Sequence, residues 1–113
     1  MKIIYQDLEI VKSKVKRIYT RNPHASPSAT FRNLRHMATV SLIGDYPILS
    51  TVFNIMNELG VQPTRFQINY CFNQSDELND EPKKIKMELL NQLFDIRYVQ
   101  LKTDNNSIKE DKN

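Results

Sequence analysis

The stretch TRFQINYCF, residues 64–72, alternates apolar and polar side chains and decides the fold class that the sequence predicts. An extended chain places alternate residues on opposite faces. The apolar face would hold Phe66, Ile68, Tyr70 and Phe72, and the other face Arg65, Gln67, Asn69 and Cys71. We therefore expect a strand over residues 64–72 with one face buried and one face open.

Amphipathic helices are expected on both sides of this strand. A capping residue, Asp45, followed by Pro47 is typical of a helix start, and Gly60 suits its end. The apolar stripe between them comprises Ile48, Leu49, Val52, Phe53, Met56 and Leu59. A second helix is predicted over residues 82–95, with Ile85, Leu89, Leu90, Leu93 and Phe94 pointing inward. The core predicted from these elements contains Leu49, Phe53, Phe66, Ile68, Leu89 and Leu93.

Short strands are expected over residues 39–44 and 96–101. The resulting order of strand, helix, strand, helix and strand predicts a small α+β domain with its helices packed on one face of a single sheet. This order and the stretch Val40-Ser41-Leu42-Ile43-Gly44-Asp45 resemble the split β-α-β, or ferredoxin-like, architecture, and more distantly the ACT-type regulatory domains. The resemblance covers residues 39–101 and implies a fold without an activity.

The N-terminal third leaves a second architecture open. Residues 8–19 fit both a helix, through the spacing of Leu8, Val11 and Val15, and a strand, through the alternation of Val11, Ser13 and Val15. If residues 8–19 and 31–37 are helical and the late strands form a wing, the chain is a winged helix. Residues 22–30 between them form a loop by composition, and Ser28 is a candidate cap for the turn that follows.

Length and composition limit the chain to one domain. We expect a globular unit over residues 1–102 and a disordered polar tail over 103–113, because 113 residues supply one core and the tail is nearly free of apolar residues. The lone Cys71 excludes an internal disulfide, and no apolar run approaches the roughly 20 residues needed to cross a bilayer. A cytoplasmic location, without membrane association, is the corresponding expectation.

The residues that catalysis or metal binding would need are scarce. Two glycines, Gly44 and Gly60, are too few for a phosphate-cradling loop, and Cys71 with two histidines, His24 and His36, cannot supply four zinc ligands. An acidic cluster over residues 76–81 precedes a helix start, where carboxylates are favoured electrostatically. We expect no enzyme activity, no cofactor and no metal.

The charge distribution points to a polyanionic partner. Residues 1–36 hold eight Lys or Arg against two acidic residues, a net charge of +6, whereas residues 37–113 hold eight against eleven, a net of −3. Basic residues neutralise phosphates, and interleaved aromatics can stack on bases. The candidate nucleic-acid-binding residues are Lys12, Lys14, Lys16, Arg17, Tyr19, Arg21, Phe31, Arg32 and Arg35.

This distribution predicts a non-enzymatic protein that binds single-stranded DNA or RNA. The alternative is a protein-interaction module, such as an inhibitor, an adaptor or a self-associating domain, that uses the open face of residues 64–72 or a sheet edge.

Overall fold

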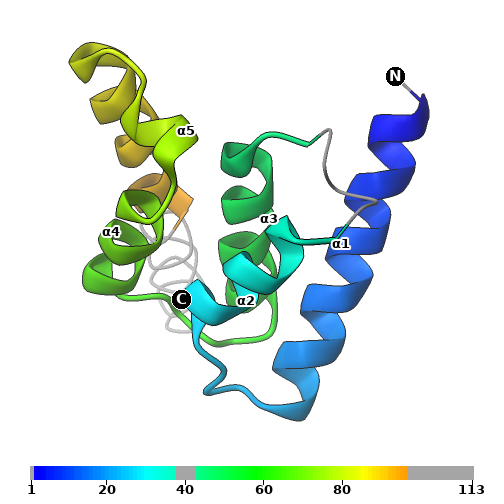
Figure 1. Cartoon of the computed structure of the whole chain (residues 1–113). Coiled ribbons are helices and arrows are strands. Elements are labelled where there is room, and N and C mark those ends of the chain that lie inside the picture. Colours follow the sequence, from blue (N-terminus) through cyan, green and yellow to red (C-terminus); the bar gives the residue numbers. More distant parts are fainter. Residues whose placement is uncertain (1, 38–42, 97–113) are drawn as a thin grey trace, which may run out of the picture.

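The computed structural model describes residues 2–37 and 43–96, which form helices joined by short loops (Figure 1). The elements are α1 (Lys2–Arg21), α2 (Pro27–Arg35), α3 (Asp45–Glu58), α4 (Arg65–Asn73) and α5 (Asp76–Asn79), followed by a helical segment over 83–96. No strand occurs in this described part of the chain. The predicted α+β class and the ferredoxin-like arrangement are therefore wrong.

The predicted strand over residues 64–72 is the helix α4. Thr64 is its N-cap: the Thr64 hydroxyl accepts a hydrogen bond from the Gln67 backbone N–H at 3.0 Å, and the Gln67 side chain accepts one from the Thr64 N–H at 2.9 Å. This reciprocal capping box satisfies two backbone donors that would otherwise lack partners at the start of a helix. Local hydrogen bonding therefore favours helix over an extended chain here.

The helical conformation redistributes the side chains of α4. Ile68, Cys71 and Phe72, which are three and four residues apart, form its buried face. Phe66 and Tyr70 lie on another face and are 75% and 49% exposed. The predicted single apolar face is wrong because a period of 3.6 residues separates side chains that a period of two would align.

Helix α3 lies at the centre of the described structure and packs against α1, α2 and α5 (Figure 1). The segment 83–96 is joined to it by hydrogen bonds from the Tyr46 hydroxyl to Gln92 Oε1 (2.7 Å) and from Asn57 Nδ2 to the Ile96 carbonyl (3.1 Å). Most of the predicted core is confirmed: Leu49, Phe53, Ile68 and Leu93 are buried and Leu89 packs against them, whereas Phe66 is exposed.

The two predicted amphipathic helices are confirmed. α3 begins at Asp45, but its N-cap is Gly44, so the capping role predicted for Asp45 is wrong. Gly60 follows the end of α3 with a φ of +79°, a conformation that glycine adopts without strain. The segment 83–96 matches the predicted second helix, except that Ile85 is 40% exposed.

The ambiguous N-terminal segment is helical. Val11, Val15 and Tyr19 form the buried ridge of α1, with Leu8 partly buried beside it, and the strand interpretation is wrong. α2 is capped by Ser26, not Ser28, and Pro27 occupies its first turn. The loop predicted over residues 22–30 is therefore wrong from residue 27 onward, because proline is tolerated in the first turn of a helix. The helices of the winged-helix alternative are thus present, but its late strand over 64–72 is helical. Residues 39–42, 97–101 and 103–113, where other predictions fall, lie outside the described residues.

Candidate nucleic-acid interface

The exposed cations of α1 lie on two sides of its buried ridge. Lys12 and Lys16 border a groove against α3 that also contains Glu58, and Lys12 Nζ lies 3.3 Å from Glu9 Oε1. Lys14 and Arg17 border a second hollow next to Met37, and this hollow shares Glu9 and Ser13 with the first groove. This division follows from helical geometry, because residues two apart are rotated by about 200° around the helix axis and so point about 160° apart.

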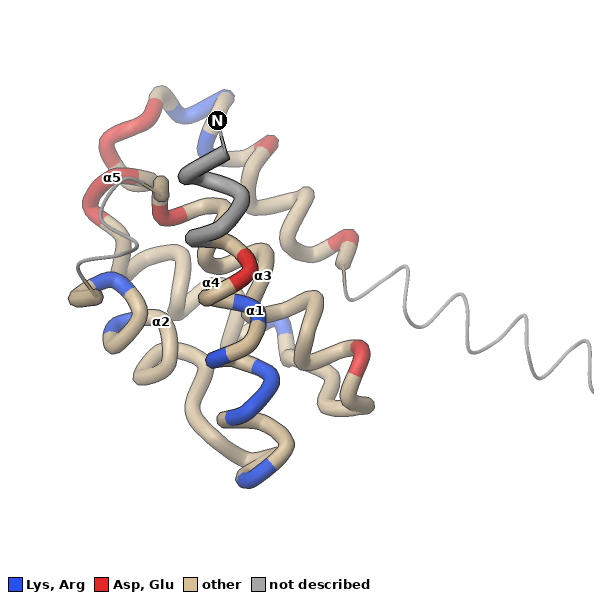
Figure 2. The backbone as a smooth tube through the Cα atoms, turned by 90° about the vertical axis from the view of Figure 1, so that its right-hand side faces the viewer, with Lys and Arg blue, Asp and Glu red and all other residues tan. Residues whose placement is uncertain are grey.

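Arg21 and Arg32 extend the basic surface beyond the middle of α1. Both are exposed, Arg21 in the last turn of α1 and Arg32 on the outer side of α2. No Asp or Glu occurs in the sequence from Ile10 to Gly44. Figure 2 shows basic residues over α1 and α2, and acidic residues around α5 with further lysines beside them, at the start of the segment 83–96.

The Arg35 side chain makes contacts with other helices that stabilise the fold. Its Nε lies 3.6 Å from Asp45 Oδ1, one of its terminal nitrogens donates to the Gln74 carbonyl at 3.5 Å, and its guanidinium lies 5.2 Å from the centre of the Phe31 ring. Asp45 is buried and also accepts a 2.6 Å hydrogen bond from the buried hydroxyl of Ser75. Arg35 therefore compensates a buried carboxylate, and its charge is partly neutralised before any phosphate approaches.

Tyr19 and Phe31 are buried, with 1% and 0% of their surface exposed. Tyr19 continues the ridge of α1, and Phe31 lies on the inner face of α2. Burial raises the pKa of the Tyr19 phenol above its ordinary value. Neither ring presents a face to a base, so the stacking role predicted for both is wrong.

The residues weighed for catalysis remain scattered. His24 and His36 are exposed, the first in the loop before α2 and the second at the end of α2. Burial raises the pKa of the Cys71 thiol to about 12, so the reactive thiolate is nearly absent at neutral pH. Within the described ranges, no three His, Cys, Asp or Glu side chains gather as a metal would require.

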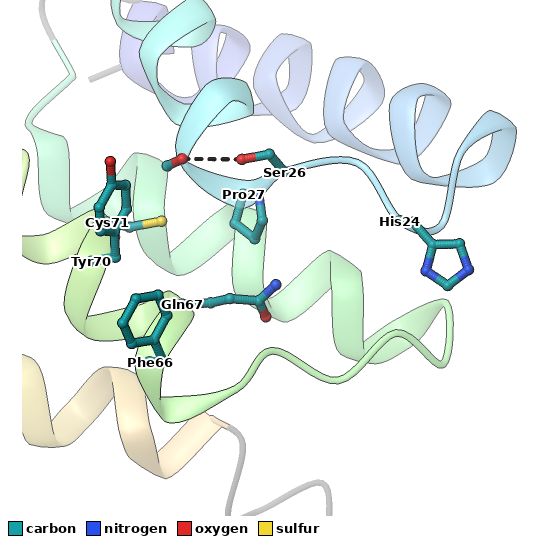
Figure 3. A pocket seen from close by; sticks show the side chains of 8 residues that line it. His24, Ser26, Pro27, Phe66, Gln67, Tyr70 and Cys71 are labelled. Carbon is teal, nitrogen blue, oxygen red and sulfur yellow. Dashed lines mark hydrogen bonds between the residues drawn. The ribbon is translucent and has the colours of Figure 1, made fainter.

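The exposed aromatic pair of α4 was missed by the sequence reasoning. The rings of Phe66 and Tyr70 are stacked, with centroids 6.1 Å apart and an interplanar angle of 21°. They line a pocket of about 340 Å³ between α4 and the start of α2, here named the α2–α4 pocket (Figure 3). Its other lining residues are His24, Ser26, Pro27, Ser28, Gln67 and Cys71. The available signal was Thr64-x-x-Gln67, which is typical of a helix start and brings residues 66 and 70 onto one face.

Comparisons with known proteins leave the chain without an assigned family. No protein-family model, no curated protein and no solved structure gives a significant match. The helices that the structure describes are each too short or too polar to cross a membrane.

Proposed function

We propose that this protein binds single-stranded nucleic acid through the exposed lysines and arginines of α1 and α2. The observation that supports the proposal is the composition of residues 10–44, which include the exposed Lys and Arg of α1 and α2 and no Asp or Glu. From outside this range, Glu9 and Glu58 lie beside Lys12 and Lys16 in the groove against α3. Phosphate contacts of this kind supply most of the affinity of sequence-independent binding. The proposed contact residues are Lys12, Lys14, Lys16, Arg17, Arg21 and Arg32.

The arrangement on α1 favours a single strand over a duplex. Lys12 and Lys16 face the groove against α3, whereas Lys14 and Arg17 face the hollow beside Met37. A flexible strand can bend around α1 and contact both sides. A duplex is stiff over tens of base pairs and would contact one side unless it were bent at an energetic cost.

A salt titration tests the proposal. If four to six of these residues contact phosphates, the logarithm of affinity for a single-stranded oligonucleotide should fall with the logarithm of salt at a slope of roughly −3 to −4. Replacing Lys14, Lys16 and Arg17 together with alanine should weaken binding and reduce the slope by about 2. Fluorescence anisotropy across a salt series measures both quantities.

The matched control removes three charges elsewhere. Lys83, Lys84 and Lys86 begin the segment 83–96, and their triple alanine variant has the same net charge as the α1 variant. This control should bind the strand with the wild-type salt slope. Equal weakening by both triple variants would show a general charge effect, and absence of binding by the wild type at low salt would refute the proposal.

A protein partner is the second candidate function. The exposed apolar side chains Phe66, Tyr70, Ile85 and Met87 favour it, because exposed aromatics are enriched at interfaces. The open strand face predicted for this role over residues 64–72 does not exist, because Arg65–Asn73 form the helix α4. Sedimentation velocity over a range of protein concentrations tests self-association, the simplest form of this alternative.

A further inference from the structure

The α2–α4 pocket has the size and lining of a site for a planar group. Its volume of about 340 Å³ lies within the roughly 300–1,000 Å³ of small-molecule sites. In Figure 3 the Pro27 ring lies on one side of the pocket, and the Phe66 ring and the Gln67 side chain lie on the other. A flat aromatic ligand would contact apolar surface on both of its faces.

The rings of Phe66 and Tyr70 border this pocket and do not belong to the hydrophobic core. Phe66 and Tyr70 are four residues apart and stack on each other, while the buried face of α4 is formed by Ile68, Cys71 and Phe72. An exposed, ordered pair of rings is a platform onto which a further ring can stack. The exposed fraction of Phe66, 75%, leaves most of that ring uncovered by the described residues.

The polar side chains of the pocket are few, namely those of His24, Ser26, Ser28, Gln67 and Tyr70. The Gln67 side-chain oxygen is occupied by the Thr64 N–H, which leaves the Gln67 Nε2 donors for an acceptor on a ligand. The Ser26 and Ser28 hydroxyls hydrogen-bond each other at 3.0 Å on the α2 side. Among the residues that the structure describes, no Lys, Arg, Asp or Glu lines the pocket. A neutral group with hydrogen-bond acceptors therefore suits this pocket better than a phosphate does.

We infer that the α2–α4 pocket receives one nucleobase of the bound single strand, stacked on the Phe66–Tyr70 platform. The inference rests on the proposed function. The pocket follows the basic residues of α1 in the sequence: Arg21 lies in the last turn of α1, and His24, three residues later, lines the pocket. A strand held by phosphate contacts at the end of α1 would have to extend across the pocket from His24 to place a base on the ring platform, where Gln67 would donate to a ring nitrogen or carbonyl of that base (Figure 3).

The test compares two probes of equal charge: a single-stranded oligodeoxynucleotide and a strand of the same length whose sites are all abasic. Phe66→Ala and Tyr70→Ala should each weaken binding of the normal strand by roughly 5- to 150-fold, without changing the salt slope. Neither substitution should change binding of the abasic strand. Phe66→Trp, which keeps a stacking surface, should retain affinity for the normal strand.

Met87→Ala is the matched control, because Met87 is 55% exposed and lies outside the pocket. It should bind both strands as the wild type does. Far-ultraviolet circular dichroism should show unchanged helix content in the Phe66 and Tyr70 variants, whose side chains contribute little to the core.

The outcomes separate this inference from the proposed function. If the triple variant of Lys14, Lys16 and Arg17 loses binding but Phe66→Ala does not, phosphate binding stands and the base site is refuted. If the wild type binds neither strand at low salt, both are refuted. If Phe66→Ala abolishes self-association seen by sedimentation and leaves strand affinity unchanged, the platform is a protein interface and the base site is again refuted.

Discussion

Two phenylalanines of α4 provide a direct test of its helical conformation. Phe66 is 75% exposed and Phe72 is 2% exposed, although both would lie on the same face of a strand. Truncating a buried phenylalanine to alanine costs about 3–5 kcal/mol, since apolar contacts are lost and a cavity is left behind. Truncating an exposed one should change the free energy of unfolding by about 0.5 kcal/mol or less.

The measurement is urea unfolding followed by circular dichroism at 222 nm. With a denaturant slope of about 2 kcal/mol/M, a difference of 3–4 kcal/mol places the midpoints of Phe66→Ala and Phe72→Ala about 1.5–2 M apart. If Phe72→Ala does not fold, the milder pair Phe66→Leu and Phe72→Leu should show the same order. If the two alanine variants lose the same free energy of unfolding to within about 1 kcal/mol, the helical assignment is refuted and a strand over residues 64–72 becomes the better description.

Two further predictions concern buried polar and ionisable groups. Arg35→Ala should destabilise the fold by about 1–3 kcal/mol, because the buried Asp45 carboxylate loses its ion pair with Arg35 and retains the hydrogen bond from Ser75. The control Arg32→Ala removes an exposed side chain and should cost about 0.5 kcal/mol or less. Equal losses of stability in urea unfolding would contradict the role given to Arg35. Cys71 should be alkylated by iodoacetamide slowly in the native protein and rapidly in urea, as mass spectrometry can show. Because burial raises its pKa from 9.0 to about 12, its contribution to stability is complete below pH 9 and is lost as the pH rises toward 12, so Cys71→Ala should lose less stability than the wild type over that interval.

The sequence was sufficient to predict α3 because independent signals agreed there. A capping-type residue, Asp45, a proline in the first turn, a continuous apolar stripe and Gly60 at the end all indicate one helix. For α1 the periodicity supported two interpretations, but both placed the lysines in solvent. Their exposure was therefore predicted correctly although the secondary structure was left open.

The error at α4 has a specific cause. Ile68 and Phe72 fit a strand face and a helix face equally well, and Cys71 was assigned to the polar side although cysteine is among the most buried residue types. In a segment of only nine residues, assigning one side chain to the polar set instead of the apolar set is enough to make a strand period of two fit the pattern better than a helix period of 3.6. Only the capping pattern of Thr64 and Gln67 distinguished the two structures locally.

The role of Arg35 had no local signal at all. Its partner Asp45 follows ten residues later, and Ser75, which binds the same carboxylate, lies 30 residues beyond Asp45. Such a contact depends on how α2, α3 and the start of α5 pack together. The sequence could show that Arg35 is basic, but not that its charge is used inside the fold.

The concentration of basic residues over α1 and α2 would also affect the kinetics of the proposed encounter with a nucleic acid (Figure 2). A molecule whose charge is unevenly distributed has an electric dipole and turns in the field of an approaching polyanion before contact. Productive collisions then become more frequent, and this gain declines as salt screens the field. The same dipole disfavours encounters between two copies through their basic surfaces. If the proposed function holds, the charge pattern orients the protein during diffusion, before the α2–α4 pocket or any short-range contact takes part.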